Sequence, residues 1–431
     1  MIDSKNSSLI SPGYKQTEVG VIPVDWKVMP LIDICNGNMQ NGVFFEPSRK
    51  GKGVKMINVS DLYKPMPIAS KSLELFDANE AEKTNYQVTE GDLFYTRSSV
   101  VASGIAQCNI YMKTGDECVV FDSHVIRARP DRKTNIPLYV YWSSIGSTSR
   151  RYLISVAKTG TMTTIDQQLL GGCPIALPPT LAEQQAIAEA LSDVDELIGS
   201  LEKLIAKKRA IKTGAMQQLL TGKQRLPGFK REWETKRLGE LVQLDPENLS
   251  SKTSLEYEFK YISLEDVSKG VLTNHSEQVF CISPSRARRI IRKGDVLVST
   301  VRPNLQSHLL FKKMDADWIC STGFSVLRCN PKESVPEYVF FHLFAHPIEH
   351  QIIALIAGSN YPAINSGDVK KLSIPVPPTL AEQQAIAAVL SDMDAEIRAL
   401  DAKLDKTKAI KQGMMSELLT GKTRLVTHLN G

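Results

Sequence analysis

The 431-residue sequence lacks the features of several common protein classes. Its seven cysteines form an odd set without a C-x-x-C pair, which fits neither a disulfide framework nor a zinc ribbon. No apolar run approaches the roughly 18 residues that a membrane span requires, the longest candidate being residues 352–357. The N-terminus has no basic segment followed by an apolar core, so no secretory signal is expected. We therefore expect a cytoplasmic chain with reduced core thiols and no membrane segment.

Motifs of catalysis and metal binding are also scarce. The sequence has no G-x-G-x-x-G after an apolar run, no H-E-x-x-H, no G-x-S-x-G and no Asp/Asn-Pro-Pro-aromatic tetrad. Gly-Lys-Thr at 421–423 lacks the earlier glycine of a phosphate-binding loop and is interpreted as a helix end. His342, His346 and His350 have helical spacing, but Pro347 interrupts that helix, so a packed or solvated face is expected instead of a metal site. The prediction is a chain without catalytic residues, metal or cofactor.

The composition is that of a folded globular protein. Hydrophobic residues make up 42% of the chain and charged residues 23%, which excludes a disordered or collagen-like chain. A length of 431 residues allows two or three domains, each with its own core. The net charge of +5 is a small basic excess that permits nucleic-acid binding without requiring it.

One segment of the chain occurs twice. Residues 178–226 and 377–425 are identical at 30 of 49 positions without a gap. The preceding segments match weakly but in the same order, for example residues 125–127 with 326–328. Because the repeated segments are alike and the others differ, we interpret the latter as two different recognition domains on a common frame, with drift of unimportant domains as the alternative. The predicted boundaries are 1–177 and 225–376 for the globular domains and 178–224 and 377–426 for the helical regions.

Each repeated segment is predicted to form one long helix. Thr180 with Glu183, and Thr379 with Glu382, have the spacing of a capping box directly after a Pro-Pro pair. Apolar residues then recur at alternating intervals of four and three, which is typical of a coiled-coil seam. The seam positions are Ile187, Leu191, Val194, Ile198, Leu201, Ile205, Ile386, Leu390, Met393, Ile397, Leu400 and Leu404. The alternative is a stripe that each helix buries against its own globular domain.

The ends and the pairing of these helices follow from glycine and charge. Gly222 and Gly421 stand where a helix ends on a left-handed residue, which gives about 40 residues per helix, unless Ser192 and Ser391 begin separate helices. The first half of the segment is acidic and the second half is basic. Antiparallel pairing sets acid beside base, whereas parallel pairing sets like charges together. We therefore predict an antiparallel pair with the globular domains at opposite ends.

Polar loops follow corresponding strands in the two globular domains. They come after residues 91–95 and 294–298, and a second pair lies just before each long helix. Arginine pairs with guanine, and asparagine or glutamine with adenine, in the major groove, although ordinary turns have a similar composition. The candidate DNA-contacting residues are Arg97, Ser98, Ser99, Lys158, Thr161, Thr163, Arg302, Asn304, Gln306, Ser359, Asn360 and Tyr361.

Basic residues cluster in both globular domains. Such clusters neutralise phosphates, and Arg289 is the contact that we single out; a solvated basic surface is the alternative. The clusters are Arg127, Arg129, Arg132, Lys133, Arg150 and Arg151 in the first domain, and Arg286, Arg288, Arg289, Arg292 and Lys293 in the second.

The repeated residues resemble those of a known family. Pro-Pro-Thr-Leu-Ala-Glu-Gln-Gln-Ala-Ile-Ala at 178–188 and 377–387, with the Leu-Leu-Thr-Gly-Lys that ends each segment, is similar to the specificity subunit of type I restriction–modification enzymes. Gly-Val-Ile-Pro-x-Asp-Trp at 20–26 and Leu-Pro-Gly-Phe-x-x-x-Trp at 226–233 add to the resemblance, which spans nearly the whole chain. The helical motifs are specific, but the globular domains do not reveal which DNA sequence is read.

The resemblance implies a fold and a function. The fold class is α+β, with two globular mixed α/β target-recognition domains separated by two long helices that form an antiparallel coiled coil. Each domain would read one half of a split, asymmetric site on double-stranded DNA. The helices would dock two modification subunits, and the complex would recruit two ATP-driven restriction subunits. In that case S-adenosylmethionine, ATP and Mg²⁺ belong to the partner subunits and this chain is not an enzyme. The alternative is a stand-alone, two-headed DNA-binding or scaffold protein without enzymatic partners.

Overall fold

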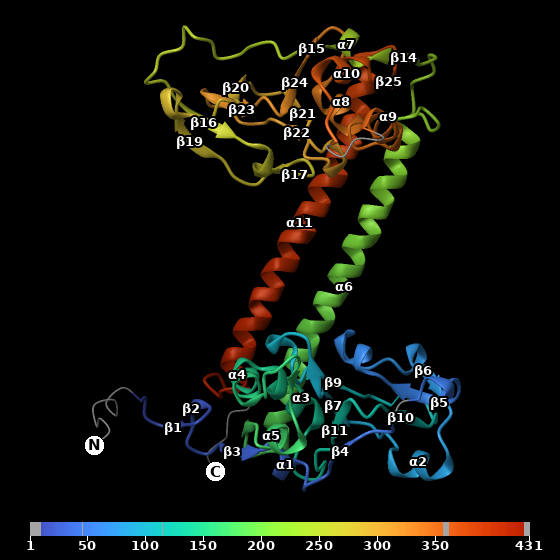
Figure 1. Ribbon diagram of the computed structural model, residues 1–431, viewed down its shortest axis with the longest axis vertical. Helices are drawn as coiled ribbons and strands as arrows, with labels where there is room; N and C mark the ends of the chain where they lie inside the picture. The colour runs from blue at the N-terminus through green and yellow to red at the C-terminus, as the bar shows by residue number, and fades with distance from the viewer. Residues whose placement is uncertain (1–9, 45, 114, 357–361, 426–431) are drawn as a thin grey trace. The chain divides into compact units, whose positions relative to one another are not determined.

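The structure is a computed structural model, which describes residues 10–44, 46–113, 115–356 and 362–425. The chain divides into two compact units, Met1–Ser200 with Leu404–Gly431, and Leu201–Lys403. Each unit contains one globular domain and parts of the two long helices, α6 (Leu181–Leu219) and α11 (Leu380–Leu418) (Figure 1).

The first globular domain is built on two sheets. The antiparallel sheet has the order β4-β11-β7-β9, and the mixed sheet has the order β10-β5-β6. All side chains of β7 and β11 are buried, which explains their nearly continuous apolar sequence. The strands of these sheets are β4 (Met39–Asn41), β5 (Lys50–Ile57), β6 (Glu74–Phe76), β7 (Leu93–Thr96), β9 (Cys108–Ile110), β10 (Val119–Phe121) and β11 (Val125–Ala128). The domain also contains β1 (Tyr14–Thr17), β2 (Gly20–Pro23), β3 (Lys27–Pro30), β8 (Ser98–Ser99), β12 (Thr163–Thr164), β13 (Pro174–Leu177), α1 (Leu31–Ile34), α2 (Glu80–Asn85), α3 (Pro137–Ile145), α4 (Ser147–Val156) and α5 (Gln167–Gly171).

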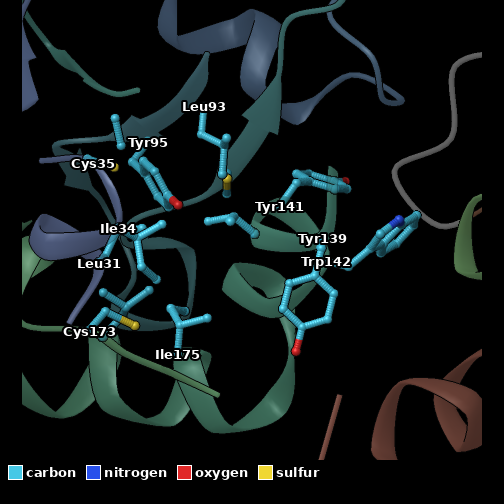
Figure 2. Close-up of a cluster of buried hydrophobic side chains, with 14 of the residues drawn as sticks. Leu31, Ile34, Cys35, Leu93, Tyr95, Tyr139, Tyr141, Trp142, Cys173 and Ile175 are labelled. Carbon is cyan, nitrogen blue, oxygen red and sulfur yellow. The ribbon is translucent and has the colours of Figure 1, made fainter. Parts of the chain in front are cut away.

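The core of this domain joins the sheet to the helices. Tyr95 of β7 projects toward α3, and its hydroxyl lies 2.7 Å from that of Ser144 (Figure 2). Tyr139 donates a 2.7 Å hydrogen bond to the carbonyl of Ala176, so its polar end is satisfied although the ring is buried. Burial raises the pKa of the Cys35 thiol in the same cluster to about 12, and each described cysteine is free. The cluster therefore contains an unreactive thiol, as expected from the sequence.

The second globular domain repeats the two sheets. Their orders are β15-β24-β21-β22, all antiparallel, and β19-β16-β23-β20, in which β16 and β23 are parallel. The strands are β15 (Val242–Leu244), β16 (Glu258–Ile262), β19 (Ser276–Val279), β20 (Ala287–Ile290), β21 (Val296–Ser299), β22 (Leu309–Leu310), β23 (Trp318–Ser321) and β24 (Phe324–Cys329). The domain also contains β14 (Glu234–Arg237), β17 (Val267–Ser268), β18 (Val271–Leu272), β25 (Ser373–Val376), α7 (Leu238–Leu241), α8 (Pro336–His342), α9 (His346–Ile356) and α10 (Ser366–Lys371).

Strand pairing corrects one of the sequence matches. Thr96 lies opposite Val125 in the first domain, and Ser299 lies opposite Phe324 in the second. Counting four residues onward from Val125 and from Phe324 makes Arg129, not Arg127, the equivalent of Arg328. Arg129 pairs with Asp92, and Arg328 with Asp295, at 2.7 Å in both domains. The match of 125–127 with 326–328 was wrong by two residues, because a slip of two keeps every strand residue on the same face.

The two long helices pair antiparallel in both units. In the second unit Lys208 of α6 pairs with Glu396 of α11 at 2.6 Å, and Arg209 pairs with Asp401 at 2.9 Å. In the first unit Asp195 of α6 pairs with Lys411 of α11. Basic second halves thus lie beside acidic first halves, which confirms the pairing predicted from charge.

The helices are continuous, and each ends three residues before the glycine that was predicted to terminate it. Each has 39 residues and runs through Ser192 or Ser391 without a break. Ser192 donates to the carbonyl of Ala188 four residues earlier, so it is a helix-interior residue and not a cap. Gly222 and Gly421 both have φ +68°, a left-handed conformation that glycine adopts without steric cost. A Cβ at Gly421 would also lie 3.1 Å from the Trp26 ring.

The predicted capping boxes of the repeated motif are only half formed. Thr180 and Thr379 accept hydrogen bonds from the Glu183 and Glu382 N–H groups at 3.2 and 3.4 Å, which is half of a capping box. The Glu183 carboxylate, which a full capping box would direct back to the helix start, instead binds Arg424. That part of the capping prediction was wrong, because the arginine supplies a charge-assisted partner.

The neighbouring glutamines attach the globular domains to the helices. The side-chain carbonyl of Gln184 accepts the Ile136 N–H at 2.9 Å, immediately before α3 begins. Gln383 accepts the Val335 N–H at the same distance before α8. Both glutamines are almost fully buried. Their recurrence in the two repeats is the signal by which sequence reasoning could have identified them.

The seam is buried in two different environments. Ile187 and Leu191 belong to the core of the first globular domain, and Ile386 and Leu390 to that of the second. The positions that are buried more fully are Ile187, Leu191, Ile198, Leu201, Ile205, Ile386, Leu390 and Ile397, and those half-buried are Val194, Met393, Leu400 and Leu404. The alternative, a stripe buried on the globular domain, holds only for the beginning of each helix, because Ile198 and Ile397 are also buried but belong to neither domain core.

Among the described residues, no single helix has the length and apolar character for a membrane span. Helices α8 and α9, with a bend of 60° between them, have that length and composition only when they are taken together.

Candidate nucleic-acid interface

The two polar loops predicted in the first domain lie side by side. Strand β8 pairs with β12, with Ser98 opposite Thr164 and Ser99 opposite Thr163. The Arg97 carbonyl accepts the Ile165 N–H at 2.9 Å, which continues the ladder by one bond. These are main-chain bonds between segments that are more than sixty residues apart in the sequence. The ladder therefore joins the predicted loops into one surface element.

Some predicted contact residues are exposed on this element and others are not. Arg97, Lys158 and Thr161 are exposed, and Ser98 is half-buried. Ser99 and Thr163 are only 8% and 6% exposed. The exposed surface of this element is therefore formed by the other predicted residues and includes little of these two side chains. Lys158 is exposed but already pairs with Asp166 at 2.9 Å.

The second domain joins its corresponding loops in the same way. Val301 lies opposite Ala363 in an antiparallel bridge, and the Arg302 N–H donates to the Pro362 carbonyl at 2.8 Å. The Thr300 carbonyl accepts the Ile364 N–H at 2.9 Å. Arg302 and Asn304 are exposed and Gln306 is half-buried. Ser359, Asn360 and Tyr361 lie outside the described residues.

The shared ladder makes the loops equivalent but not their arginines. Thr300 occupies the place of Arg97 in the ladder. The Arg97 carbonyl accepts the Ile165 N–H, and the Thr300 carbonyl accepts the N–H of the equivalent residue, Ile364. Arg302 then occupies the place of Ser99. The two domains therefore present their exposed arginines from different positions of one frame.

Buried groups fix the loop of the second domain. Arg302 and Gln306 have φ of 48° and 55°, a region that non-glycine residues rarely adopt. His308 ends the loop, is fully buried and accepts the Ser299 N–H on Nδ1 at 3.1 Å. Burial lowers the pKa of His308 to about 4, so the ring is neutral at pH 7 and can accept this bond.

Many of the clustered basic residues stabilise the domains internally. Arg129 is engaged by Asp92, and Arg150 donates to the carbonyls of Ser103 and Ala106 at 2.8 and 2.9 Å. Arg127 is only 3% exposed, and desolvation by burial lowers its pKa. These side chains are not available to phosphates, which corrects that part of the prediction. Arg132, Lys133 and Arg151 are exposed.

The same division applies to the second domain. Arg289 is 15% exposed and pairs with Asp245, whose carboxylate also accepts the Val326 N–H at 2.7 Å. The guanidinium is thus mostly enclosed and neutralised by a carboxylate, which leaves it little surface for the predicted phosphate contact. Arg292 pairs with Glu247 at 2.7 Å, and Arg288 donates to backbone carbonyls. Arg286 and Lys293 are exposed at this cluster.

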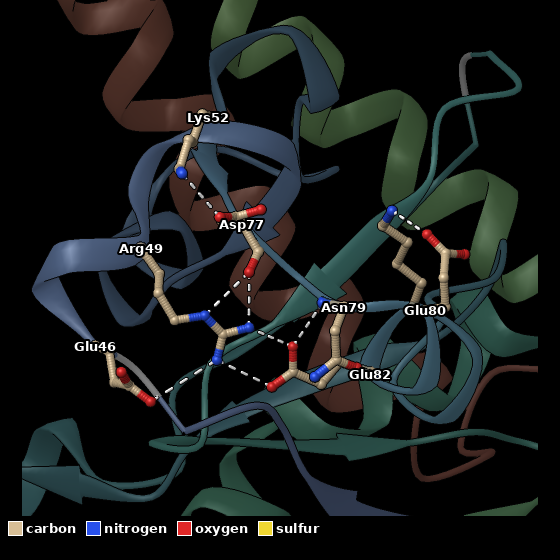
Figure 3. Close-up of polar contacts among 8 residues, drawn as sticks. Glu46, Arg49, Lys52, Asp77, Asn79, Glu80 and Glu82 are labelled. Atoms are coloured by element: carbon tan, nitrogen blue, oxygen red, sulfur yellow. Dashed lines mark hydrogen bonds and ion pairs between the residues drawn. The ribbon is translucent and has the colours of Figure 1, made fainter.

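A further arginine, which the sequence did not single out, organises the edge of the first domain. Arg49 binds the Asp77 carbonyl at 2.7 and 3.0 Å and the Glu82 carboxylate, and Glu46 lies 3.8 Å away (Figure 3). Glu82 also accepts the Asn79 N–H at the start of α2. The Arg49 guanidinium, which donates to Glu82, holds the pKa of that carboxyl below its usual value. This cluster is structural, and the exposed Lys52 belongs to it, because its Nζ pairs with the Asp77 carboxylate at 3.0 Å.

The histidines with helical spacing are not gathered around a common point. His342 is buried against Tyr338, with ring centroids 4.7 Å apart, whereas the rings of His346 and His350 contact each other at 4.2 Å. Burial lowers the pKa of His342 to about 3. The described part of the chain contains no group of three metal-ligating side chains.

The fold and the paired loops define a class: a duplicated recognition protein with two different contact surfaces on one repeated frame. The model of the type I restriction modification DNA specificity domain matches residues 23–209 and again residues 230–408. The chain therefore belongs to the type I restriction modification DNA specificity family.

Similar proteins match between 72% and 96% of this chain. The putative type I restriction enzyme MjaX specificity subunit of Methanocaldococcus jannaschii is 24% identical, over 96% of this chain and 97% of that protein. The type I restriction enzyme MjaVIII specificity subunit of the same organism is 24% identical over 72% of this chain and 76% of that protein. The crystal structure of the type I restriction–modification S subunit from M. genitalium has a TM-score of 0.59 and 15% identity, covering 91% of this chain and 96% of that one. That likeness supports the α+β fold.

Proposed function

We propose that this chain selects the DNA target of a type I restriction–modification complex, with each globular domain reading a different half of a split, asymmetric site. The observation that carries the proposal is the pair of loop ladders, at Ser98–Ser99 with Thr163–Thr164 and at Val301 with Ala363. One frame builds both ladders, yet the exposed side chains on them differ. Two domains that hold different exposed side chains on equivalent loops are suited to read two different half-sites.

A domain exchange tests independent reading. The first globular domain would be replaced by that of another family member, and methylated adenines would be mapped across the genome of a host that expresses the hybrid. One half of the methylated sequence should change while the other half and its orientation stay. A change in both halves, or in neither, would contradict independent reading.

We further propose that the helices dock two modification subunits and that the complex recruits two restriction subunits. The support is the repetition of the helical frame, identical at 30 of 49 positions, which supplies two similar docking surfaces. The chain itself would be non-catalytic and act in the cytoplasm, where its DNA substrate lies. S-adenosylmethionine, ATP and Mg²⁺ would bind to the partner subunits.

Affinity purification from the native host separates this proposal from a stand-alone DNA-binding protein. Methyltransferase chains should be recovered at two copies per copy of this chain. Recovery of the chain alone would favour the stand-alone alternative. Methylation of DNA by the purified chain without partners would contradict the non-catalytic assignment.

A further inference from the structure

An aliphatic side chain stands among the polar groups of the second domain's loop. Leu305 is 56% exposed and lies in the short 3₁₀ turn Pro303–Leu305, between the left-handed residues Arg302 and Gln306. Leu305 carries no hydrogen-bonding group and is therefore absent from the residues predicted to read base edges. A leucine within an Arg-Pro-Asn-Leu-Gln loop is nevertheless a visible exception in the sequence.

The loop holds this leucine outward on a fixed backbone. The Thr300 hydroxyl donates to the Gly323 carbonyl at 2.8 Å, and the Arg302 N–H donates to the Pro362 carbonyl at the same distance. Pro303 is buried beneath the turn, and the fully buried His308 closes the loop. Exposure of Leu305 therefore follows from a constrained conformation. Strained backbone that its surroundings enforce is typical of functional sites.

The neighbours of Leu305 indicate what it contacts. Arg302 and Asn304 are exposed in the same turn and carry the donors and acceptors that read base edges in the major groove. The apolar group that the major groove offers is the 5-methyl of thymine. We propose that Leu305 is a specificity-determining residue that packs on the 5-methyl group of one thymine in the half-site of the second domain. This inference rests on the proposed function.

Deoxyuridine substitution tests the contact directly, because uracil keeps the base pair and lacks only the methyl group. The full chain, co-purified with its modification subunits, would be titrated with the mapped target in which each thymine of the relevant half-site is replaced singly. Wild type should bind about fourfold more weakly at one position, the effect of removing one buried CH₂-sized group. Leu305→Ala should bind the thymine duplex more weakly and show no further loss at that position.

Controls separate the inference from the proposed function. Leu255→Ala changes another leucine of this domain, 66% exposed, and should leave the thymine-to-uracil response intact. If Leu305→Ala responds to each uracil as wild type does, or if no uracil affects wild type, the thymine contact is wrong. If Leu305→Ala weakens binding to every thymine and uracil duplex by the same factor, Leu305 would instead act as a wedge between base steps. That result would also overturn the thymine contact. If the wild-type complex still prefers the target over scrambled DNA, the proposed function stands even when the thymine contact fails. If the wild-type complex shows no such preference, the proposed function and the thymine contact are both wrong.

Discussion

The Arg424 guanidinium binds both carboxylate oxygens of Glu183, although 241 residues separate them in the sequence. Arg225 binds both oxygens of Glu382 in the same way, at 2.6 and 2.8 Å. In each unit the chain that leaves one long helix is thus fastened to the first turn of the other. Each carboxylate is only 1% exposed.

Removal of one arginine should therefore destabilise its unit. Arg424→Ala leaves Glu183 buried without its charge partner, and removing one member of a buried pair costs about 3 kcal/mol of unfolding free energy. Urea unfolding measures the change. Lys422→Ala, which removes an exposed ion pair with Glu417, should change stability by less than about 0.5 kcal/mol. Equal effects of the two variants would show that the buried pair contributes nothing special.

The adjacent glutamines of the repeated motif provide a matched comparison. Gln184→Ala leaves the Ile136 N–H without its acceptor and should cost about 1–3 kcal/mol of unfolding free energy. Gln185 is exposed and bonds only to the Glu189 side chain four residues onward, so Gln185→Ala should be nearly neutral. Thermal unfolding of the two variants should separate them clearly. A neutral Gln184→Ala would refute the role of this bond.

Stability should fall in weak acid because of two buried histidines. Burial lowers the pKa of His308 to about 4 and that of His342 to about 3, whereas the unfolded chain binds a proton near pH 6.5. Their contribution is complete above pH 6.5 and is lost as the pH falls toward the folded values, by about 2 kcal/mol each at pH 5. Urea unfolding between pH 5 and pH 8 should show this slope. His342→Leu should flatten it, and an unchanged slope in that variant would exclude His342 as a cause.

Base and phosphate contacts should differ in their response to sequence and salt. Arg302→Ala should cost about 1–3 kcal/mol on the target and relax one position of the half-site. Arg286→Ala should weaken binding to all DNA similarly and lower the salt slope by about one unit. Arg289→Ala should reduce folding stability by about 2 kcal/mol, since it breaks the pair with Asp245. A uniform loss with Arg302→Ala would make it a backbone contact.

The sequence predicted the helical frame well and the contact surface only in part. Periodicity, charge and glycine are local signals, so the helix ends just before Gly222 and Gly421 and the antiparallel pairing could be predicted. Whether an arginine faces solvent depends on distant carboxylates such as Asp245, which the strand pairing brings close and the sequence leaves apart. The burial of Ser99 could not be predicted for the same reason, because its partner strand lies at Thr163–Thr164.

The main-chain ladders beneath the loops have a consequence for how new target sequences arise. The bonds from Ile165 to Arg97 and from Ile364 to Thr300 involve only backbone atoms, so neither bond depends on the side chain at Arg97 or Thr300. An arginine in one domain and a threonine in the other are held equally well there. Exposed side chains such as Asn304 can therefore be exchanged while these backbone bonds persist, so a change of target requires only a few codons.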